Sequence, residues 1–150
     1  MSVVTEKARI AEICLTITGM NGAGSMPRSL PDADLPYTVL LTGECTRRRE
    51  DNLISIERIY RLAFLVKSWA EGVETEAEEL AEPFFARFED AFMTRPSLQL
   101  TGNTTRLEGV QNADLGNDTG ITNIELGGVG YAGVIFDLHV LSMRVMTRGQ

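Results

Sequence analysis

The sequence predicts an α+β domain in which a mixed or antiparallel β-sheet is flanked by an N-terminal helix and a central acidic helix. Apolar residues recur at helical spacing near the N-terminus and around residues 75–93, whereas they alternate over residues 54–66. Strand-like segments follow each helix, which gives the order α-β-β-α-β-β-β. The length of 150 residues corresponds to one domain, residues 1–150.

Residues 3–18 are predicted to form the first helix. Its apolar side is formed by Val4, Ala8, Ala11 and Leu15, which lie one helical turn apart, and is extended by Ile10, Cys14 and Ile17. A segment rich in proline and glycine follows, residues 20–36, and predicts a long flexible loop. We expect this loop to be mobile in the isolated protein and to become ordered against a neighbouring molecule.

Residues 37–49 and 52–69 are predicted to be two strands joined by a polar turn. The second strand has one apolar face formed by its even positions Ile54, Ile56, Tyr60, Leu62, Phe64 and Val66. Its odd positions are partly polar, so we expect the opposite face to be half covered. These strands and the last one are longer than a core of this size needs. Their ends are therefore expected to project and to meet neighbouring subunits.

The central helix is predicted to begin at a capping box formed by Thr75 and Glu78. Pro83 cannot donate a backbone hydrogen bond, which predicts either a kink or a fresh helix start at this residue. The apolar stripe expected to pack on the even face of the preceding strand is Leu80, Phe84, Phe88 and Phe92.

Three further β segments are predicted. Residues 98–110 form a strand or a pair of strands, and residues 121–126 and 131–146 form one strand each, with a loop at 111–120 and a turn at 127–130. In the last strand the apolar pattern changes parity after Val140. This change predicts either a bulge or a strand that outruns the core.

The composition excludes several classes of function. A net charge of −7 argues against a general nucleic-acid-binding protein, which needs a basic face. No apolar run approaches the roughly 20 residues of a membrane span, and the N-terminus lacks the features of a secretory signal, so we expect cytoplasmic synthesis. Cys14 and Cys45 are far apart and are expected to be reduced, packed thiols.

No catalytic, cofactor-binding or metal site is predicted, and we expect the protein not to be an enzyme. His139 shares the polar face of the last strand with Asp137, but no nucleophile is recognisable, so a solvated or hydrogen-bonded histidine is expected. The glutamates of residues 71–82 fit a solvated helix start better than a metal site. Residues 114–118 only faintly resemble a calcium loop.

Arg47, Arg48 and Arg49 form the one basic cluster of the sequence and are the candidate interface residues. Glu50 and Asp51 follow them directly. The cluster is therefore interpreted as a hairpin tip balanced by its own acids, as a partner-binding tip or as a site of nucleic-acid contact.

A set of sequence features resembles the tail terminator or tail-completion proteins of long-tailed, siphovirus-like bacteriophages. The matching features are Tyr60 on its strand, Glu82-Pro83-Phe84 in the acidic helix, Arg95-Pro96 before a strand, and Tyr131-Ala132-Gly133 at the entry to the closing strand. The resemblance covers residues 37–146, and the glycine- and proline-rich segment departs from the short members of that family.

This resemblance implies a structural virion protein that forms a ring, usually of six subunits, at the head-proximal end of the tail. Such a ring ends polymerisation of the tail tube and provides the surface for head–tail joining. The implied partners are other copies of the chain, the tail tube protein and a head-completion or neck protein, with DNA passing through the channel without specific binding. The alternatives are another neck or connector protein, a tail-tube subunit, or a small-ligand-binding or enzymatic α+β domain.

Overall fold

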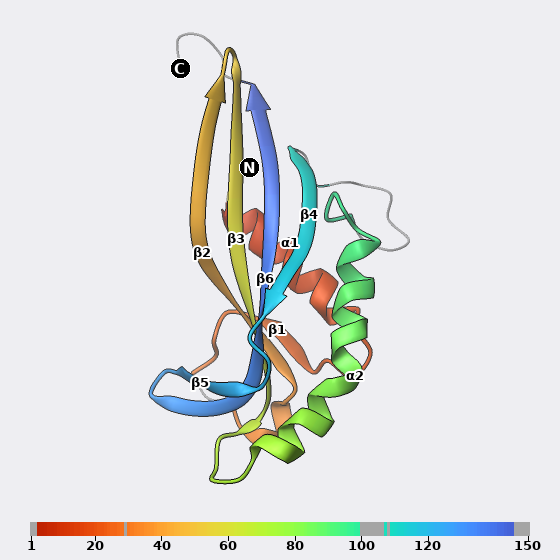
Figure 1. Ribbon diagram of the computed structural model, residues 1–150, viewed down its shortest axis with the longest axis vertical. Helices are drawn as coiled ribbons and strands as arrows, with labels where there is room; N and C mark the ends of the chain where they lie inside the picture. The colour runs from red at the N-terminus through yellow and green to blue at the C-terminus, as the bar shows by residue number, and fades with distance from the viewer. Residues whose placement is uncertain (1–2, 29, 100–106, 108, 146–150) are drawn as a thin grey trace.

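The computed structural model describes residues 3–28, 30–99, 107 and 109–145. Two helices lie on one side of a curled β-sheet, as Figure 1 shows, so the predicted α+β class is confirmed. The elements in chain order are α1 Val3–Leu15, β1 Gly22–Gly24, the 3-10 helix η1 Asp32–Asp34, β2 Tyr37–Glu50, β3 Leu53–Ser68, α2 Glu74–Met93, β4 Val110–Asp118, β5 Thr122–Leu126 and β6 Val129–Val145.

The sheet is mixed, with β3 and β6 at its centre. The strand order is β1-β2-β3-β6-β4, and β5 also pairs with β6. β1 runs parallel to β2, whereas the other pairings among the described strands are antiparallel. The central pair aligns Phe64 with Val134 and Tyr60 with Leu138, which places their side chains on one face. This face forms most of the core.

Aromatic rings of α2 pack against this face of β3 and β6, as predicted. The ring centroid of Phe64 lies 4.7 Å from that of Phe84 and 5.2 Å from that of Phe88. Phe88 also stacks on Phe136, with 4.5 Å between the centroids. These distances are within the range of favourable aromatic pairs, so the rings contribute more than their buried area alone.

Three details of α2 differ from the prediction or decide between its alternatives. Leu80 is 46% exposed, because the alanine at position 81 and not Leu80 faces the sheet. The capping box is wrong: the helix begins at Glu74, its N-cap Val73 makes no side-chain hydrogen bond, and Thr75 is already helical. Pro83 lies inside one continuous helix, which bends along its length in Figure 1, so a fresh helix start is excluded.

A second apolar cluster covers part of the opposite face of the sheet. Leu30 and Leu35 are buried there against Ala63, Leu65 and Tyr131. The half-covered second face is therefore confirmed. The segment of residues 20–36 contains β1 and η1 and is thus less irregular than predicted, whereas its mobility stays a prediction.

The C-terminal strands differ from the prediction at their start. Residues 110–118 form β4, although a loop was predicted from residue 111. Register shifts between Val110 and Asn112 and between Leu115 and Asp118 break the alternation of apolar residues, so the sequence pattern does not reveal the strand. Much of the strand predicted over residues 98–110 lies outside the described residues.

The other end of this region agrees with the prediction. Gly127 and Gly128 both have positive φ angles, of 60° and 80°, which is the geometry of a two-residue hairpin turn between β5 and β6. Beyond Val140, β6 keeps an unbroken register with β3 as far as its end. The change of parity therefore reflects a strand that outruns the core, and a bulge in β6 is excluded.

The helix α1 buries only part of the apolar side that the sequence predicts for it. Ile10, Ile13 and Cys14 are fully buried, whereas Val4 is 77% and Leu15 52% exposed. The predicted placement of Val4 and Leu15 on the side that faces the core is therefore wrong, whereas the predicted extension by Ile10 and Cys14 is buried. Burial raises the pKa of Cys14 to about 12, so its thiol stays protonated and behaves as a small apolar group.

A buried carboxylate fixes the first turn of α1 to the sheet. Glu6 is 2% exposed and accepts a hydrogen bond from the hydroxyl of Tyr60. Arg58 Nη1 lies 3.7 Å from Glu6 Oε1, and Arg58 Nη2 donates a hydrogen bond to Cys45 Sγ at 3.4 Å. Burial and the Glu6 carboxylate raise the pKa of Tyr60, so the phenol remains a donor. The network joins α1 to β2 and β3.

We expect Phe88→Ala to lower the free energy of unfolding by about 3–5 kcal/mol, because it removes two ring contacts and leaves a cavity. Leu80→Ala is the matched control on the same helix and should cost much less, since its side chain is half exposed. Chemical denaturation measures both. Equal losses in the two variants would contradict this packing.

We expect Glu6→Ala to cost about 3–5 kcal/mol, because it leaves Arg58 near the core without its carboxylate partner. Glu6→Gln keeps an acceptor for Tyr60 and should cost less. Thermal unfolding of both variants against the native protein tests the difference, and a neutral effect of Glu6→Ala would show that the network contributes nothing to stability.

Candidate interface on the projecting arm

Three strands of the sheet extend beyond both helices at one end of the molecule (Figure 1). The 16 residues of β3 span about 53 Å at 3.3 Å each, whereas the 20 residues of α2 span about 30 Å at 1.5 Å each. α2 therefore cannot cover the whole of β3. We call the projecting part, residues 46–50, 53–57 and 141–145, the arm. The predicted projection of the strand ends is confirmed.

A bulge in β2 decides which of its side chains face the side of the helices. Thr42 is opposite Tyr60, whereas Cys45 is opposite Arg58, with a register shift in between. Gly43 lies in this bulge, where a Cβ atom would come within 2.9 Å of a backbone carbonyl oxygen of β3. Because directly opposite residues point to the same side, the odd-numbered residues of β2 face the helix side beyond the bulge.

As a result, two of the three candidate arginines lie on the helix side of the arm. Arg47 is opposite Ile56, and Arg49 is opposite Ile54. Arg144 of β6 is opposite Ile54 from the other flank. The two isoleucines are half-buried, and the arginines are exposed. We call these five residues the arginine–isoleucine face.

The opposite face of the arm carries charges of both signs. Arg48 lies on it, opposite Ser55, and shares it with Glu50 and Glu57. The ion pairs within the described part of the chain do not include any of the three arginines of residues 47–49. On this face, the glutamates offset the charge of Arg48, which agrees with a hairpin tip that is neutralised by its own acidic residues. The arginine–isoleucine face has no acidic residue among its five members and does not agree with that hypothesis.

His139 and Asp137 both lie on this opposite face, as predicted. His139 Nδ1 is 3.3 Å from Glu57 Oε1, and Arg61 Nε is 3.9 Å from Asp137 Oδ1. Both pairs are partly exposed. A hydrogen-bonded strand histidine is thus confirmed.

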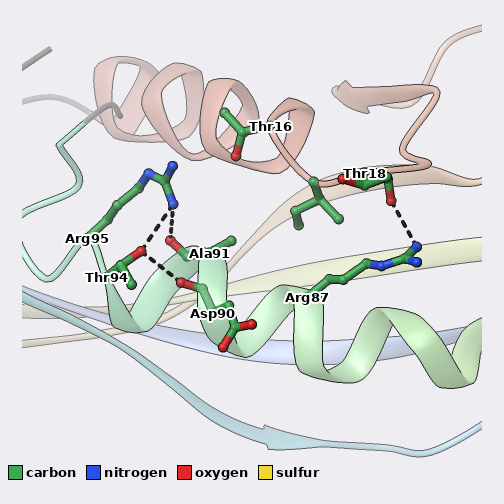
Figure 2. Close-up of a pocket in the computed structure, with 8 residues that line it drawn as sticks. Thr16, Thr18, Arg87, Asp90, Ala91, Thr94 and Arg95 are labelled. Carbon is green, nitrogen blue, oxygen red and sulfur yellow. Dashed lines mark hydrogen bonds between the residues drawn. The ribbon is translucent and has the colours of Figure 1, made fainter. Parts of the chain in front are cut away.

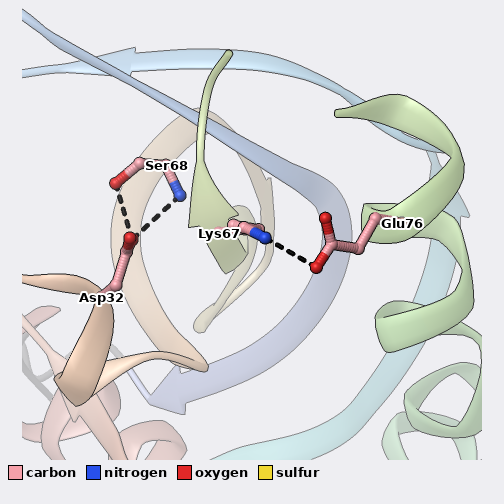
Figure 3. Close-up of polar contacts among 4 residues, drawn as sticks. All are labelled: Asp32, Lys67, Ser68 and Glu76. Carbon is pink, nitrogen blue, oxygen red and sulfur yellow. Dashed lines mark hydrogen bonds and ion pairs between the residues drawn. The ribbon is translucent and has the colours of Figure 1, made fainter. Parts of the chain in front are cut away.

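The acidic groups singled out in the sequence do not converge. Glu76 pairs with Lys67 at 2.6 Å, next to the hydrogen bond that Ser68 Oγ donates to Asp32 at 2.7 Å (Figure 3). Asp118 accepts a hydrogen bond from a backbone amide in the following turn. Over the described ranges, no group of three or more metal-ligating side chains is present.

A pocket of about 440 Å³ lies where α1 ends beside the last turns of α2 (Figure 2). Both of its arginines donate to backbone carbonyls. Arg95 bonds to the oxygen of Ala91 at 2.7 Å, and Arg87 bonds to that of Thr18 at 3.0 Å. Arg87 also lies over the ring of Phe84, 5.0 Å from its centroid.

These contacts give the pocket arginines a structural role. Cations near the carboxyl end of a helix satisfy carbonyl groups that lack an intrahelical partner and interact favourably with the helix dipole. Arg95 does so for α2, and Arg87 joins α2 to the segment after α1. In the sequence, Arg95 was noted only as part of the Arg95-Pro96 pair before a strand, and Arg87 was not singled out. A basic residue at the predicted end of a helix is a signal for such a cap.

Comparison with known proteins gives no match, either among models of protein families or among curated protein sequences. None of the helices in the described ranges is long and apolar enough to cross a membrane.

Proposed function

We propose that this chain is a structural virion protein, a tail terminator whose copies form a ring at the head-proximal end of a phage tail. The ring, of six subunits by resemblance, ends polymerisation of the tail tube and offers its other side to the neck protein. The sequence resemblance over residues 37–146 supports this proposal, together with a fold that matches the sheet and flanking helices it implies.

The arm is the observation that carries the proposal. It carries two half-buried isoleucines and three exposed arginines at the end of the sheet, beyond the ends of the chain's own helices. Such an extension adds apolar surface without adding to the core, which is a cost unless another surface covers it. In a protein that assembles into a ring, a neighbouring subunit would cover this surface.

The charge of the chain agrees with a channel that DNA traverses without adhering. Six copies at −7 each would carry −42 formal charges, which repel phosphate groups. The arginines of the arm would then contact other proteins and not DNA. At such contacts, guanidinium groups pair with carboxylates in a bidentate manner.

Replacing Arg47, Arg48 and Arg49 together with glutamate should leave the fold intact and block tail completion. We expect tails of irregular length or heads without tails in electron micrographs of particles from the phage that encodes this chain. The physical reason is that reversal of three charges changes the charge at the proposed contact by six units per copy.

The triple replacement with lysine is the matched control, since it keeps the charge at each position, and it should complete far more tails than the glutamate variant. Normal infectious particles from the glutamate variant would exclude the arm from the contact. Absence of the native chain from purified tails would overturn the proposed function.

A further inference from the structure

The arginine–isoleucine face continues the side of the sheet that the chain's own helices cover. Ile56 and Ile54 follow Tyr60 and Leu62 at even positions of β3, and this side is closed by α1 and α2 as far as the network around Glu6. Beyond that network, β2, β3 and β6 extend past the ends of α1 and α2 (Figure 1). The arm therefore continues, without a helix above it, a surface that elsewhere in the molecule packs against helices, and Ile54 and Ile56 are half-buried on it.

The arginines define a trough whose width suits one helix. Arg49 and Arg144 lie on strands that flank β3, so they are two strand spacings apart, about 9–10 Å. Arg47 lies two residues from Arg49, about 7 Å along the strand. A helix with its side chains is about 10–12 Å across. A helix resting on Ile54 and Ile56 would thus have positive charge along both of its sides.

The outward side of α2 has the complementary pattern. Ala86 is exposed, and Met93, two turns further along, is 72% exposed. Positions three and four residues away on a helix lie to either side of a given residue, which places Glu82 and Glu89 on one flank of Ala86 and Asp90 on the other. All three carboxylates are exposed, and none belongs to an ion pair in the described part of the chain.

A single copy cannot bring these two surfaces together. The strands of the arm extend past the end of α2 that is nearer to them, as Figure 1 shows. The outward side of α2 points away from the sheet, since its opposite side is buried in the core. Contact between the two surfaces therefore requires a second molecule.

We propose that the arginine–isoleucine face of one copy binds the outward, acidic side of α2 in a second copy of this chain. The contact joins two different surfaces, so it is head-to-tail and generates a ring if the rotation closes. Arg47 and Arg49 take part in it, and Arg48 does not. This inference names the partner of the arm and rests on the proposed function only for the closure into a ring.

Charge reversal tests the contact in purified protein by sedimentation velocity, at concentrations up to about 1 mM. Arg47→Glu with Arg49→Glu should weaken self-association at least about tenfold, because it places glutamates opposite carboxylates. Arg48→Glu is the matched control on the same strand and should leave association within about twofold of the native protein. Glu82→Lys with Glu89→Lys should weaken association like the arm variant.

An equal mixture of the arm variant and the helix variant should associate again. In an alternating head-to-tail array, each reversed arm meets a reversed helix, and each native arm meets a native helix. Recovery in the mixture supports the pairing, whereas continued failure overturns it. A native protein that remains monomeric over the whole concentration range also overturns it.

A disulfide cross-link tests the same contact without relying on charge. In a Cys45→Ser background, the variants Ile54→Cys and Ala86→Cys should form a covalent heterodimer when mixed and oxidised. Ser55→Cys lies on the opposite face of the arm and should not cross-link to Ala86→Cys. Equal yields for both pairs would overturn the assignment of the face.

The outcomes separate this inference from the proposed function. Association and cross-linking as predicted, by a chain that is absent from phage tails, would refute the tail role and leave the contact standing. Tails that require the chain but are completed normally by the Arg47→Glu, Arg49→Glu variant would refute the contact and leave the tail role standing.

Discussion

The packing of the phenylalanines of α2 on β3 and β6 determines the rest of this structure. Phe88 contacts both Phe64 and Phe136, so one helix spans the two central strands. The helix layer can cover only as much sheet as its length allows, and a helix advances less than half as far per residue as a strand. β2, β3 and β6, with 14, 16 and 17 residues, therefore extend beyond the end of the helix layer. The arm follows from this mismatch of lengths.

The local features of the fold could be predicted from the sequence, and features that depend on distant partners could not. The hairpin of β2 and β3 and the aromatic stripe follow from periodicity within short windows. Leu80 was misplaced because Ala81 is an equally good candidate for the core until the position of the sheet is known. β4 was missed because its register against β6 shifts twice, and each shift moves apolar residues to a different parity.

The same division applies to the candidate interface. The sequence predicts an arginine-rich strand end, and alternation alone separates Arg48 from its two neighbours. Which of the two groups faces the helix side depends on the bulge at Gly43, because without it Arg48 would continue the face of Leu40 and Thr42. The proximity of Arg144 depends on the pairing of β3 with β6, between segments about 90 residues apart along the chain. No local pattern contains that information.

The arginines have two effects on the arm that act together. β2 is an edge strand beyond its short pairing with β1, and exposed edges invite strand addition by other molecules. Charged side chains along the edge oppose such addition, because a second copy added in this way would bring like charges together. The same charges favour a partner that brings carboxylates. A helix satisfies its own backbone groups and needs none from the sheet edge. The charges of the arm are thus compatible with the acidic helix that we propose as its partner, and they disfavour another strand.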